Sequence, residues 1–313
     1  MDRTDQIILE QIEDKTVSGE KLSKLTGISR VAVWKRIKKL EDLGYRIKHS
    51  SEGYRLIERT PYLLPVEIKR ALKTGYIGKN YIFFDQIDST NMYAKSNDLP
   101  DGTVVLAENQ TKGKGRKGRR WISSKGKGLY FSIVIKRNYP LNDLMKLSLL
   151  FPYAVKEAIK DYLENQIKIK WPNDLYINNR KFAGFLIETE IEGNEINRII
   201  AGIGININNE PEEFGDIKDT ATSLKIEEGK TFCRKELFCR VLETIEKSLD
   251  KFSSLDLTDE IEKDLLWKGE NIRILDEGIE GRLIGLDRSG GLKVLTEKGV
   301  LTVYSGDISV RKI

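Results

Sequence analysis

Histidine and cysteine are nearly absent from this sequence of 313 residues. His49 is the single histidine, and Cys233 and Cys239 are the only cysteines. With one histidine in the chain, a Ser-His-Asp triad and a zinc hydrolase site are both disfavoured. The cysteine spacing is that of neither a zinc site nor a redox pair. The sequence therefore favours two reduced thiols in a cytoplasmic protein.

Long apolar runs are also missing. No stretch of about 18 consecutive apolar residues occurs, which argues against a membrane-spanning helix and a membrane partner. Residues 1–5 are polar and acidic, unlike the start of a signal peptide. Lysine and arginine number 53 against 48 aspartates and glutamates, a net charge of +5. So mild an excess does not by itself indicate a nucleic-acid partner, and the positions of the cations matter more.

Residues 1–62 have the pattern of a winged helix-turn-helix domain. The predicted elements are a helix at 4–13, a helix from Ser18 to Gly27, a helix from Ser29 to Gly44, and hairpin strands at 45–48 and 54–57. Serine is a good N-cap and glycine a good C-terminal stop, which defines the helix ends. On the second helix, Leu22 and Leu25 are expected to face inward. Pro61 and Pro65 mark the end of this domain.

Residues 65–266 mix helix and strand patterns without strict alternation. Such a mixture favours an α+β domain with a mixed or antiparallel sheet over a doubly wound fold. The predicted strands lie at 81–84, 103–107, 129–135 and 199–207, and the predicted helices at 142–164 and 234–252. Residues 267–313 carry short strands separated by glycine turns, at 271–275, 279–286, 292–295 and 300–304. This last segment predicts a small SH3-like β-barrel, so the chain as a whole is expected to be α+β with three domains.

Glycines alternate with cations between Lys112 and Arg120, and Trp121 closes the run. Glycine lets backbone N–H groups approach a polyanion closely, and the cations neutralise its charge. The run is not a Walker A loop, because it lacks the Gly-Lys-Ser/Thr ending. On its own, such a run favours a disordered basic surface loop or a nucleic-acid patch.

Further polar motifs flank this run. They are Asp88-Ser89-Thr90-Asn91, Ala107-Glu108-Asn109-Gln110-Thr111, Lys170-Trp171-Pro172-Asn173-Asp174 and Arg180-Lys181-Phe182-Ala183-Gly184. Each has an ordinary structural explanation when taken singly. Ser89 can cap a helix that begins at Thr90, and Trp171 and Pro172 can be core and turn residues.

Together and in this order, these motifs closely resemble the biotin–protein ligase family. The stretch Ala201–Asn206 matches as well, so the matched motifs run through most of residues 80–210. The winged helix and the C-terminal barrel resemble the family's bifunctional class, which is also the repressor of biotin genes. The chain departs from that class at Lys114, where bifunctional members often carry arginine. The charge is kept, so the departure concerns only the fine geometry of the loop.

The resemblance implies a two-step reaction. The biotin carboxylate attacks the α-phosphorus of ATP, giving biotinyl-adenylate and pyrophosphate, and an acceptor lysine amine then attacks the mixed anhydride. Because two anions must meet, the site needs cations at the α-phosphate and Mg²⁺ on the other phosphates. By matching position, Lys181 and Arg116 are expected to face the carboxylate–phosphate junction. Lys170 is expected to hold the phosphate, and Asp174 to orient a lysine or deprotonate the incoming amine.

The resemblance also implies the ligand contacts. Those for biotin are Ser89, Thr90, Asn91, Gln110, Lys114, Gly115, Arg116, Lys181 and Gly184. Those for ATP are Gly113, Arg116, Arg119, Arg120, Trp121, Lys170, Asn173 and Asn206. Trp121 is expected to cover the adenine and Asn206 to hydrogen-bond it, while the metal ligands stay unassigned. Because the adenylate hydrolyses in water, residues 112–128 are expected to be mobile when empty and to order over it.

The third predicted helix is strongly basic and carries no acid between residues 29 and 39. On a recognition helix, its cations would reach phosphates and the residues near its start would reach base edges. The expected DNA contacts are Ser29, Arg30, Val31, Trp34, Lys35 and Lys38, and the other cations available for phosphates are Arg36 and Lys39. A solvated basic helix face is the plainer alternative. Because the basic residues coincide with the winged-helix pattern, the sequence favours binding of operator DNA by this helix.

The expected partners are biotin, ATP, operator DNA, the acceptor lysine of a biotin carboxyl carrier protein, and a second copy of this chain. A lone winged helix binds weakly, which is why a ligand-promoted homodimer on a palindrome is expected. The C-terminal cations Arg282, Arg288 and Lys293 are expected to be surface residues. The alternatives are a lipoate–protein ligase, a non-catalytic biotin-sensing transcription factor, and a ligase whose head no longer binds DNA. The Lys-Trp-Pro-Asn-Asp block argues against the first, and the intact cations of the site argue against the second.

Overall fold

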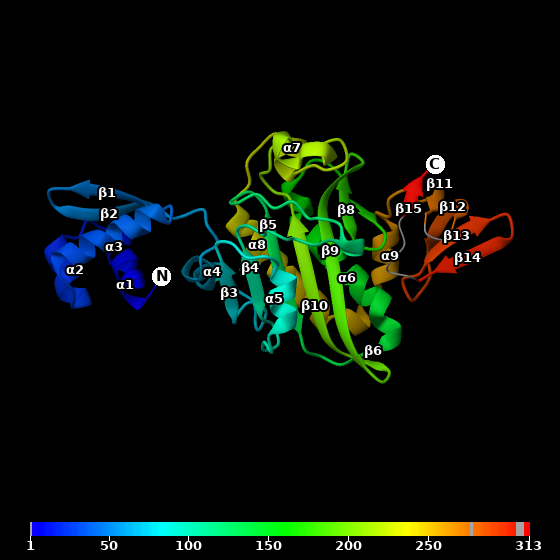
Figure 1. Cartoon of the computed structure of the whole chain (residues 1–313), viewed down its shortest axis with the longest axis horizontal. Helices are drawn as coiled ribbons and strands as arrows, with labels where there is room; N and C mark the ends of the chain where they lie inside the picture. Colours follow the sequence, from blue (N-terminus) through cyan, green and yellow to red (C-terminus); the bar gives the residue numbers. More distant parts are fainter. Residues whose placement is uncertain (1, 276–277, 305–309) are drawn as a thin grey trace. The chain divides into compact units, whose positions relative to one another are not determined.

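The computed structural model describes residues 2–275, 278–304 and 310–313 (Figure 1). The chain divides into two compact units, Met1–Arg70 and Ala71–Ile313. The first unit is longer than the predicted head of residues 1–62, because the helix α4 (Pro65–Ala71) is joined to it. Glu67 of α4 is buried and accepts hydrogen bonds from Tyr45 Oη at 2.9 Å and Arg59 Nη1 at 2.5 Å.

The first unit, here called the head, has the predicted winged-helix plan. Its elements are α1 (Arg3–Glu13), α2 (Gly19–Thr26), α3 (Arg30–Asp42), β1 (Arg46–Ser50) and β2 (Gly53–Glu58), with β1 and β2 antiparallel. Ser18 and Ser29 cap α2 and α3 as predicted, each accepting a backbone N–H at 3.2 Å. The prediction that Leu25 faces inward is wrong, since Leu25 is exposed while Leu22 is fully buried. On this short helix Leu25 lies about 60° round the axis from Leu22, outside the narrow buried stripe.

The second unit is built on a mixed sheet, as predicted. The strand order is β3-β4-β5-β10-β9-β8-β7, and β6 pairs with β10. The strands are β3 (Tyr81–Phe84), β4 (Val104–Ala107), β5 (Leu129–Ile135), β6 (Tyr139–Pro140), β7 (Lys168–Lys170), β8 (Asp174–Ile177), β9 (Arg180–Glu192) and β10 (Glu195–Ile205). The pair β3–β4 is parallel and the other pairs are antiparallel.

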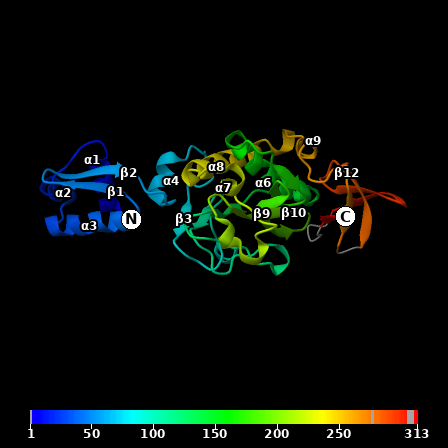
Figure 2. The ribbon, with the colours of Figure 1, turned by 90° about the horizontal axis from the view of Figure 1, so that it is seen from above.

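Helices cover both faces of this sheet. The short helix α5 (Thr90–Ser96) packs with Val105, Val134 and Ile200 on one face. On the other face lie α6 (Leu144–Ile159) and α8 (Arg234–Asp250), side by side in Figure 2. Phe238 of α8 contacts Phe131 of β5 edge to face, with ring centroids 5.1 Å apart. The remaining short helices of the described chain are η1 (Arg116–Gly118), η2 (Leu141–Asp143), η3 (Lys160–Tyr162), η4 (Pro211–Ile217), α7 (Leu224–Glu228), η5 (Phe252–Ser254) and α9 (Leu257–Glu262).

The C-terminal part of the second unit is the antiparallel β domain that its glycine-punctuated strands predict. Its strands are β11 (Asn271–Ile274), β12 (Ile279–Leu286), β13 (Leu292–Thr296), β14 (Gly299–Val303) and β15 (Val310–Lys312), in the order β14-β13-β12-β11-β15. The strand β15 was not predicted, because three residues are too few to show alternation. None of the helices in the described part of the chain has the length and apolar character needed to cross a membrane.

Candidate functional site

A cavity of about 890 Å³ lies in the second unit and gathers the predicted motifs. Its predicted lining residues are Ser89, Thr90, Asn91, Gln110, Lys114, Gly115, Arg116, Arg119, Arg120, Trp121, Lys170, Asn173, Asp174, Lys181, Gly184 and Asn206. Gly113 alone among the predicted residues of this site is not in the lining. Its carbonyl instead accepts a hydrogen bond from the backbone N–H of Trp121 at 2.9 Å. Segments distant in sequence therefore meet at one place, as the motif order suggests.

Paired glycines make the floor of the cavity flat. Gly204 of β10 and Gly184 of β9 face each other across the strand pair. The Trp121 indole occupies the space that side chains there would fill, because a β-carbon at Gly204 would lie 2.4 Å from Trp121 Cε2. A β-carbon at Gly184 would lie 2.9 Å from the same indole, at Cζ3. The glycines thus let an aromatic ring lie directly on the backbone of the sheet.

Polar atoms without partners lie beside this floor. Trp121 Nε1, a donor, and Asn206 Oδ1, an acceptor, are buried and have no hydrogen-bond partner among the described residues. Asn206 Nδ2 is already used, since it donates to the carbonyl of Thr222 at 3.0 Å. Buried polar atoms are normally hydrogen-bonded. Hydrogen bonds from these two atoms to a bound heterocycle would remove the free-energy cost of leaving them buried without a partner.

A compact polar cluster adjoins the cavity, and its members Thr90, Asn91 and Gln110 belong to the lining. Gln110 Oε1 accepts from the backbone N–H of Thr90 at 2.8 Å. Ser132 Oγ lies 2.8 Å from Thr90 Oγ1 and 2.7 Å from Asn91 Oδ1, and its one hydroxyl hydrogen can be donated to either. Gly202 makes room for this cluster, because a β-carbon there would lie 2.4 Å from Asn91 Oδ1. Ser89 caps α5 by accepting from the N–H of Met92 at 3.4 Å, so the ordinary explanation of Ser89 holds although it also lines the cavity.

Cations also line the cavity, and neighbouring groups orient them. Lys181 Nζ lies 2.6 Å from Asp174 Oδ1 and 5.5 Å from the centre of the Trp121 ring. Arg116 Nη1 donates to Asn173 Oδ1 at 2.9 Å. The strands β8 and β9 hold Asp174 and Lys181, and the turn before β8 holds Asn173. An anion entering here would meet positive charge that is already in place.

Lys170 is a strongly desolvated cation of the same cavity. Its Nζ lies 5.0 Å from the ring centre of Trp267 and 5.3 Å from that of Tyr176, and 3.4 Å from Tyr176 Oη. Burial lowers the pKa of Lys170 to about 8. An ammonium in such a place interacts strongly with any phosphate it meets, because little water screens it.

Sequence reasoning missed several lining residues. Arg311 comes from the unpredicted strand β15, and a segment of η4 around Phe214 and Gly215 closes another side. Neither has a local sequence signal. Arg282, Arg288 and Lys293 do not line the cavity. Arg282 and Arg288 are exposed, as predicted, whereas Lys293 is half-buried, and Arg282 donates to the carbonyl of Gly269. The described residues contain no group of three or more His, Cys, Asp or Glu side chains arranged to hold a metal ion.

The head exposes the start of α3. Arg30, Val31 and Trp34 line a hollow of about 410 Å³ together with residues 49–54 of the hairpin. Lys35 and Lys38 are exposed, although Lys38 Nζ lies 2.9 Å from Glu41, and Ser29 caps the helix. The predicted DNA contacts therefore lie on one exposed helix. A helix start beside a hairpin is the arrangement with which winged helices meet DNA.

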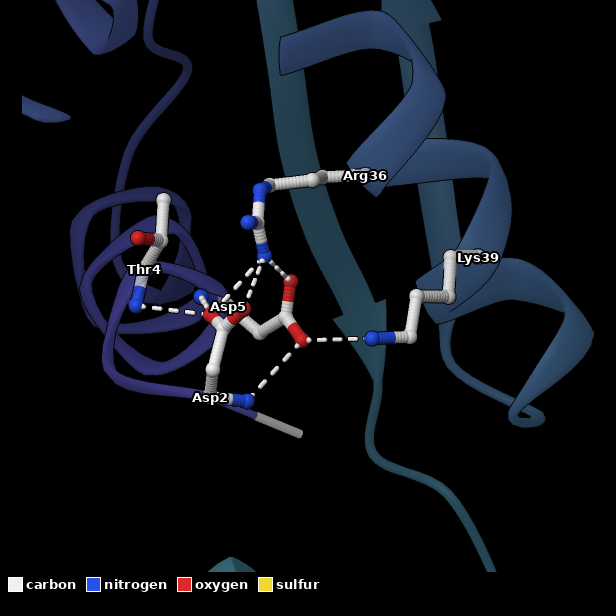
Figure 3. A network of polar contacts seen from close by, with 5 residues as sticks. All are labelled: Asp2, Thr4, Asp5, Arg36 and Lys39. Carbon is white, nitrogen blue, oxygen red and sulfur yellow. Dashed lines mark hydrogen bonds and ion pairs between the residues drawn. The ribbon is translucent and has the colours of Figure 1, made fainter. Parts of the chain in front are cut away.

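The other cations of α3 are held by acids of α1 and its N-cap, which the sequence prediction did not foresee. Arg36 Nη1 donates to Asp2 at 2.7 Å and to Asp5 at 2.7 Å, and Lys39 Nζ donates to Asp5 at 3.1 Å (Figure 3). The Asp5 side chain is fully buried. The expectation that Arg36 and Lys39 are available for phosphates is therefore wrong, because Asp2 and Asp5 neutralise them from a different helix.

Comparisons with known proteins agree with this architecture. The chain matches the Biotin/lipoate A/B protein ligase family at residues 83–206, an HTH domain at 3–55 and the biotin protein ligase C-terminal domain at 269–311. The solved biotin protein ligase from Aquifex aeolicus, in complex with biotin and ATP, is 38% identical, with a TM-score of 0.65 over 75% of this chain and 100% of that chain.

Full-length relatives decide the class. The bifunctional ligase/repressor BirA of Escherichia coli is 29% identical over 94% of this chain and 92% of its own length. The bifunctional ligase/repressor BirA of Bacillus subtilis is 35% identical over 97% of this chain and 96% of its own length. The chain therefore belongs to the family of bifunctional biotin–protein ligases and repressors.

Proposed function

We propose that this chain activates biotin with ATP, passes it to a lysine of a biotin carboxyl carrier domain, and represses transcription from operator DNA in response to biotin. The observation that carries the proposal is a single cavity with a flat aromatic floor at Trp121, a polar cluster at Gln110 and cations at Lys181 and Lys170. An adenine, a ureido ring and a carboxylate–phosphate junction require these three kinds of surface.

The polar cluster suits the ureido head of biotin. That head has N–H donors and one carbonyl acceptor. Thr90 and Gln110 line the cavity with hydroxyl and amide groups that can donate and accept, and Thr90 Oγ1 lies 3.2 Å from Gln110 Oε1 and 2.8 Å from Oγ of the buried Ser132. Their mutual hydrogen bonds fix them before the ligand arrives, so little ordering is needed on binding. The biotin carboxylate would then extend toward Lys181.

The first step needs positive charge at the junction of two anions. Lys181 would face the charge that develops as the carboxylate oxygen bonds to the α-phosphorus and pyrophosphate leaves. Its short contact to Asp174 supports the prediction that this carboxylate orients a lysine. In the second step the acceptor amine forms the amide bond, AMP leaves, and the amine loses a proton. That Asp174 takes this proton stays a prediction.

Magnesium would arrive with the nucleotide. Mg²⁺ is commonly held by one or two carboxylates and the substrate's phosphates rather than by an all-protein cage. The cavity fits this pattern, since Glu212, Glu213 and Asp216 of η4 lie in its wall but form no metal cluster among the described residues. The ion would screen the β- and γ-phosphates while the lysines act at the α-phosphate. We assign the reaction to the cytoplasm, where the free thiols of Cys233 and Cys239 stay reduced.

Incubation with biotin, ATP, Mg²⁺ and a biotin-acceptor domain, read by mass spectrometry, tests the ligase. The expected product is the acceptor with one added biotinyl group. Lipoate with a lipoyl-acceptor domain serves as the matched control, and modification of that pair instead would favour a lipoate ligase. A protein that binds biotin but makes no adenylate in a single turnover would be a sensor without catalysis.

Adenylation should fall as the pH rises through about 8. Burial holds the pKa of Lys170 at about 8, below its usual value, so the lysine is charged below this pH and neutral above it. Only the charged form attracts phosphate. Single-turnover pyrophosphate release, followed from about pH 6.5 to about pH 9.5, measures this fall in rate. Lys170→Arg keeps its charge over this range, so its rate should not fall. The same fall in both proteins would show that another group titrates.

Adenylate formation should promote dimerisation. One head carries few unpaired cations on α3, so two heads on a palindrome are needed for useful affinity. If the ligand favours the dimer, dimerisation must tighten ligand binding by the same factor, typically through a coupling of about 1–3 kcal/mol. Sedimentation at fixed protein concentration without ligand, with biotin, and with biotin plus ATP measures the coupling. Equal association constants under all three conditions would contradict the proposal that the adenylate promotes dimerisation, but would not bear on ligation or DNA binding.

A further inference from the structure

A buried arginine outside the cavity joins the two ends of the glycine–arginine loop. Arg234, the first residue of α8, donates from Nη1 to Glu108 Oε2 at 2.8 Å and from Nη2 to Glu108 Oε1 at 3.1 Å. The same Nη1 donates to the carbonyl of Gly128 at 2.9 Å. The side chain of Arg234 is 5% exposed and that of Glu108 is 0% exposed. Glu108 precedes the segment 109–127, and Gly128 follows it.

Further hydrogen bonds join the two ends of the segment 109–127. Ser123 Oγ accepts from the N–H of Gln110 and donates to its carbonyl, both at 2.9 Å. The N–H of Ser124 donates to Tyr130 Oη at 3.1 Å. Gly128 must be glycine for this packing, because a β-carbon there would lie 2.4 Å from Tyr130 Oη. The segment thus leaves and rejoins the sheet at a narrow, rigid base.

We propose that Arg234 is a positioning residue that fixes both ends of segment 109–127, so that the segment closes in one geometry and retains the adenylate. The inference rests on the proposed ligase function, because the adenylate is the ligand to be retained. Arg234 does not line the cavity, and it acts through Glu108 and Gly128. Gln110, two residues beyond Glu108, accepts from Thr90 in the polar cluster.

The use of a buried ion pair here supports a role in geometry. Apolar residues of similar volume often stabilise a fold as well as a buried ion pair does, because charges lose hydration on burial. A guanidinium, however, presents several donors in a rigid fork. It can therefore hold a carboxylate from one side of the loop and a carbonyl from the other in a fixed relation. An apolar pair could fill this space, but it could not join the two ends.

The test uses the full chain with the double substitution Glu108→Gln and Arg234→Met. Arg234→Met alone leaves a buried carboxylate unpaired and endangers folding, whereas the double variant removes both charges with little change in volume. Two quantities are measured: the dissociation rate of biotinyl-adenylate made from labelled biotin, and amide hydrogen exchange of the ligand-free protein. We expect the adenylate to dissociate about tenfold faster than from the wild type. We also expect the amides of Trp121 and Ser124 to exchange about tenfold faster, with those of β5 and β10 unchanged.

Arg240→Met is the matched control on the same helix. Arg240, six residues after Arg234 in α8, donates to the carbonyl of Ala158 and to Asp161 and contacts neither Glu108 nor Gly128, so its loss should weaken helix packing without changing adenylate dissociation. Wild-type exchange at Trp121 and Ser124 in the double variant would overturn the anchoring, and wild-type adenylate dissociation would overturn its role in retention. Failure of the wild type to form adenylate would refute the ligase function instead. Hydrogen exchange of the ligand-free protein would still show whether Arg234 fixes the two ends of the segment 109–127.

Discussion

Replacing Lys181 with alanine should lower the rate of adenylation by about 10²–10³-fold, the usual cost of removing one group that faces developing charge. Lys181 lines the cavity with its Nζ 2.6 Å from Asp174, so the ammonium is oriented before substrate binds. The fold should be little affected, because the side chain is 30% exposed and such ion pairs contribute about 1 kcal/mol or less. Pyrophosphate release in a single turnover measures the effect.

Lys168→Ala provides the control for this substitution. Lys168 is 32% exposed, similar to Lys181, and pairs with Asp264, but it does not line the cavity. The control should therefore release pyrophosphate at the wild-type rate. If Lys181→Ala also does so, Lys181 does not act at the reacting atoms and the proposed site is misassigned.

Replacing Asp5 with alanine should destabilise the head by about 2–3 kcal/mol, which is less than the usual cost of about 3–5 kcal/mol for breaking a buried ion pair because its partners Arg36 and Lys39 remain partly hydrated. Asp5 is fully buried and holds Arg36 and Lys39 of α3 (Figure 3). Its loss should raise the exchange rate of the α1 and α3 amides by about 30- to 150-fold, since each 1.4 kcal/mol is tenfold. Operator binding in a gel shift should weaken, while adenylation by the second unit should be unchanged.

Asp2→Asn is the matched control, because Asp2 contacts the same Arg36 while 53% exposed, and asparagine can keep the N-cap hydrogen bonds from the N–H groups of Thr4 and Asp5. It should have a much smaller effect. If the two variants exchange at the same rate, the burial of Asp5 is not what stabilises α3. If adenylation falls with Asp5→Ala, the two units do not act independently.

Lowering the pH should also destabilise the head. Burial raises the pKa of Asp5, but hydrogen bonds from Arg36 and Lys39 outweigh it, so the pKa lies below its usual value. The hydrogen bond from Arg36 lowers the pKa of Asp2 to about 2. Depressed carboxyl pKa values stabilise the folded state above the ordinary pKa, and this contribution is lost as the pH falls through the folded-state value. Amide exchange in α1 and α3 should therefore accelerate as the pH is lowered from about 4 toward 2, after correction for the pH dependence of intrinsic exchange.

The sequence could predict the elements and the motif residues because both are local. The three helices of the head, two of them with serine caps, the hairpin, and the strands β3, β4, β5 and β10 of the mixed sheet follow from apolar periodicity over a few residues. The strands β6, β7, β8 and β9 were not predicted. The lining residues that were predicted follow from motifs in a fixed order. Even the glycines of the floor are visible in the sequence, although only the register between β9 and β10 shows that Gly184 and Gly204 face each other.

The rest depends on contacts between distant residues. Asp2 and Asp5 appear in the sequence only as a polar start, and nothing local indicates that they neutralise a helix more than thirty residues away. Glu108 and Arg234 are separated by 126 positions, so their pairing exists only once α8 has packed under the sheet. Arg311 reaches the cavity from a strand too short to be recognised. Such pairings are fixed by topology, which one sequence does not show.

The acids that hold α3 also limit how strongly salt affects operator binding. Arg36 and Lys39 are paired with Asp2 and Asp5, and Lys38 with Glu41, which leaves Arg30 and Lys35 as the cations of this helix without an ion pair among the described residues. Each phosphate that a cation neutralises releases condensed counterions and adds about −0.9 to the slope of log K against log salt. The helix then contributes a slope of about −2 for each head, and about −4 for a dimer. An operator complex of this kind keeps more of its affinity as the ionic strength rises than one that engages every cation of the helix.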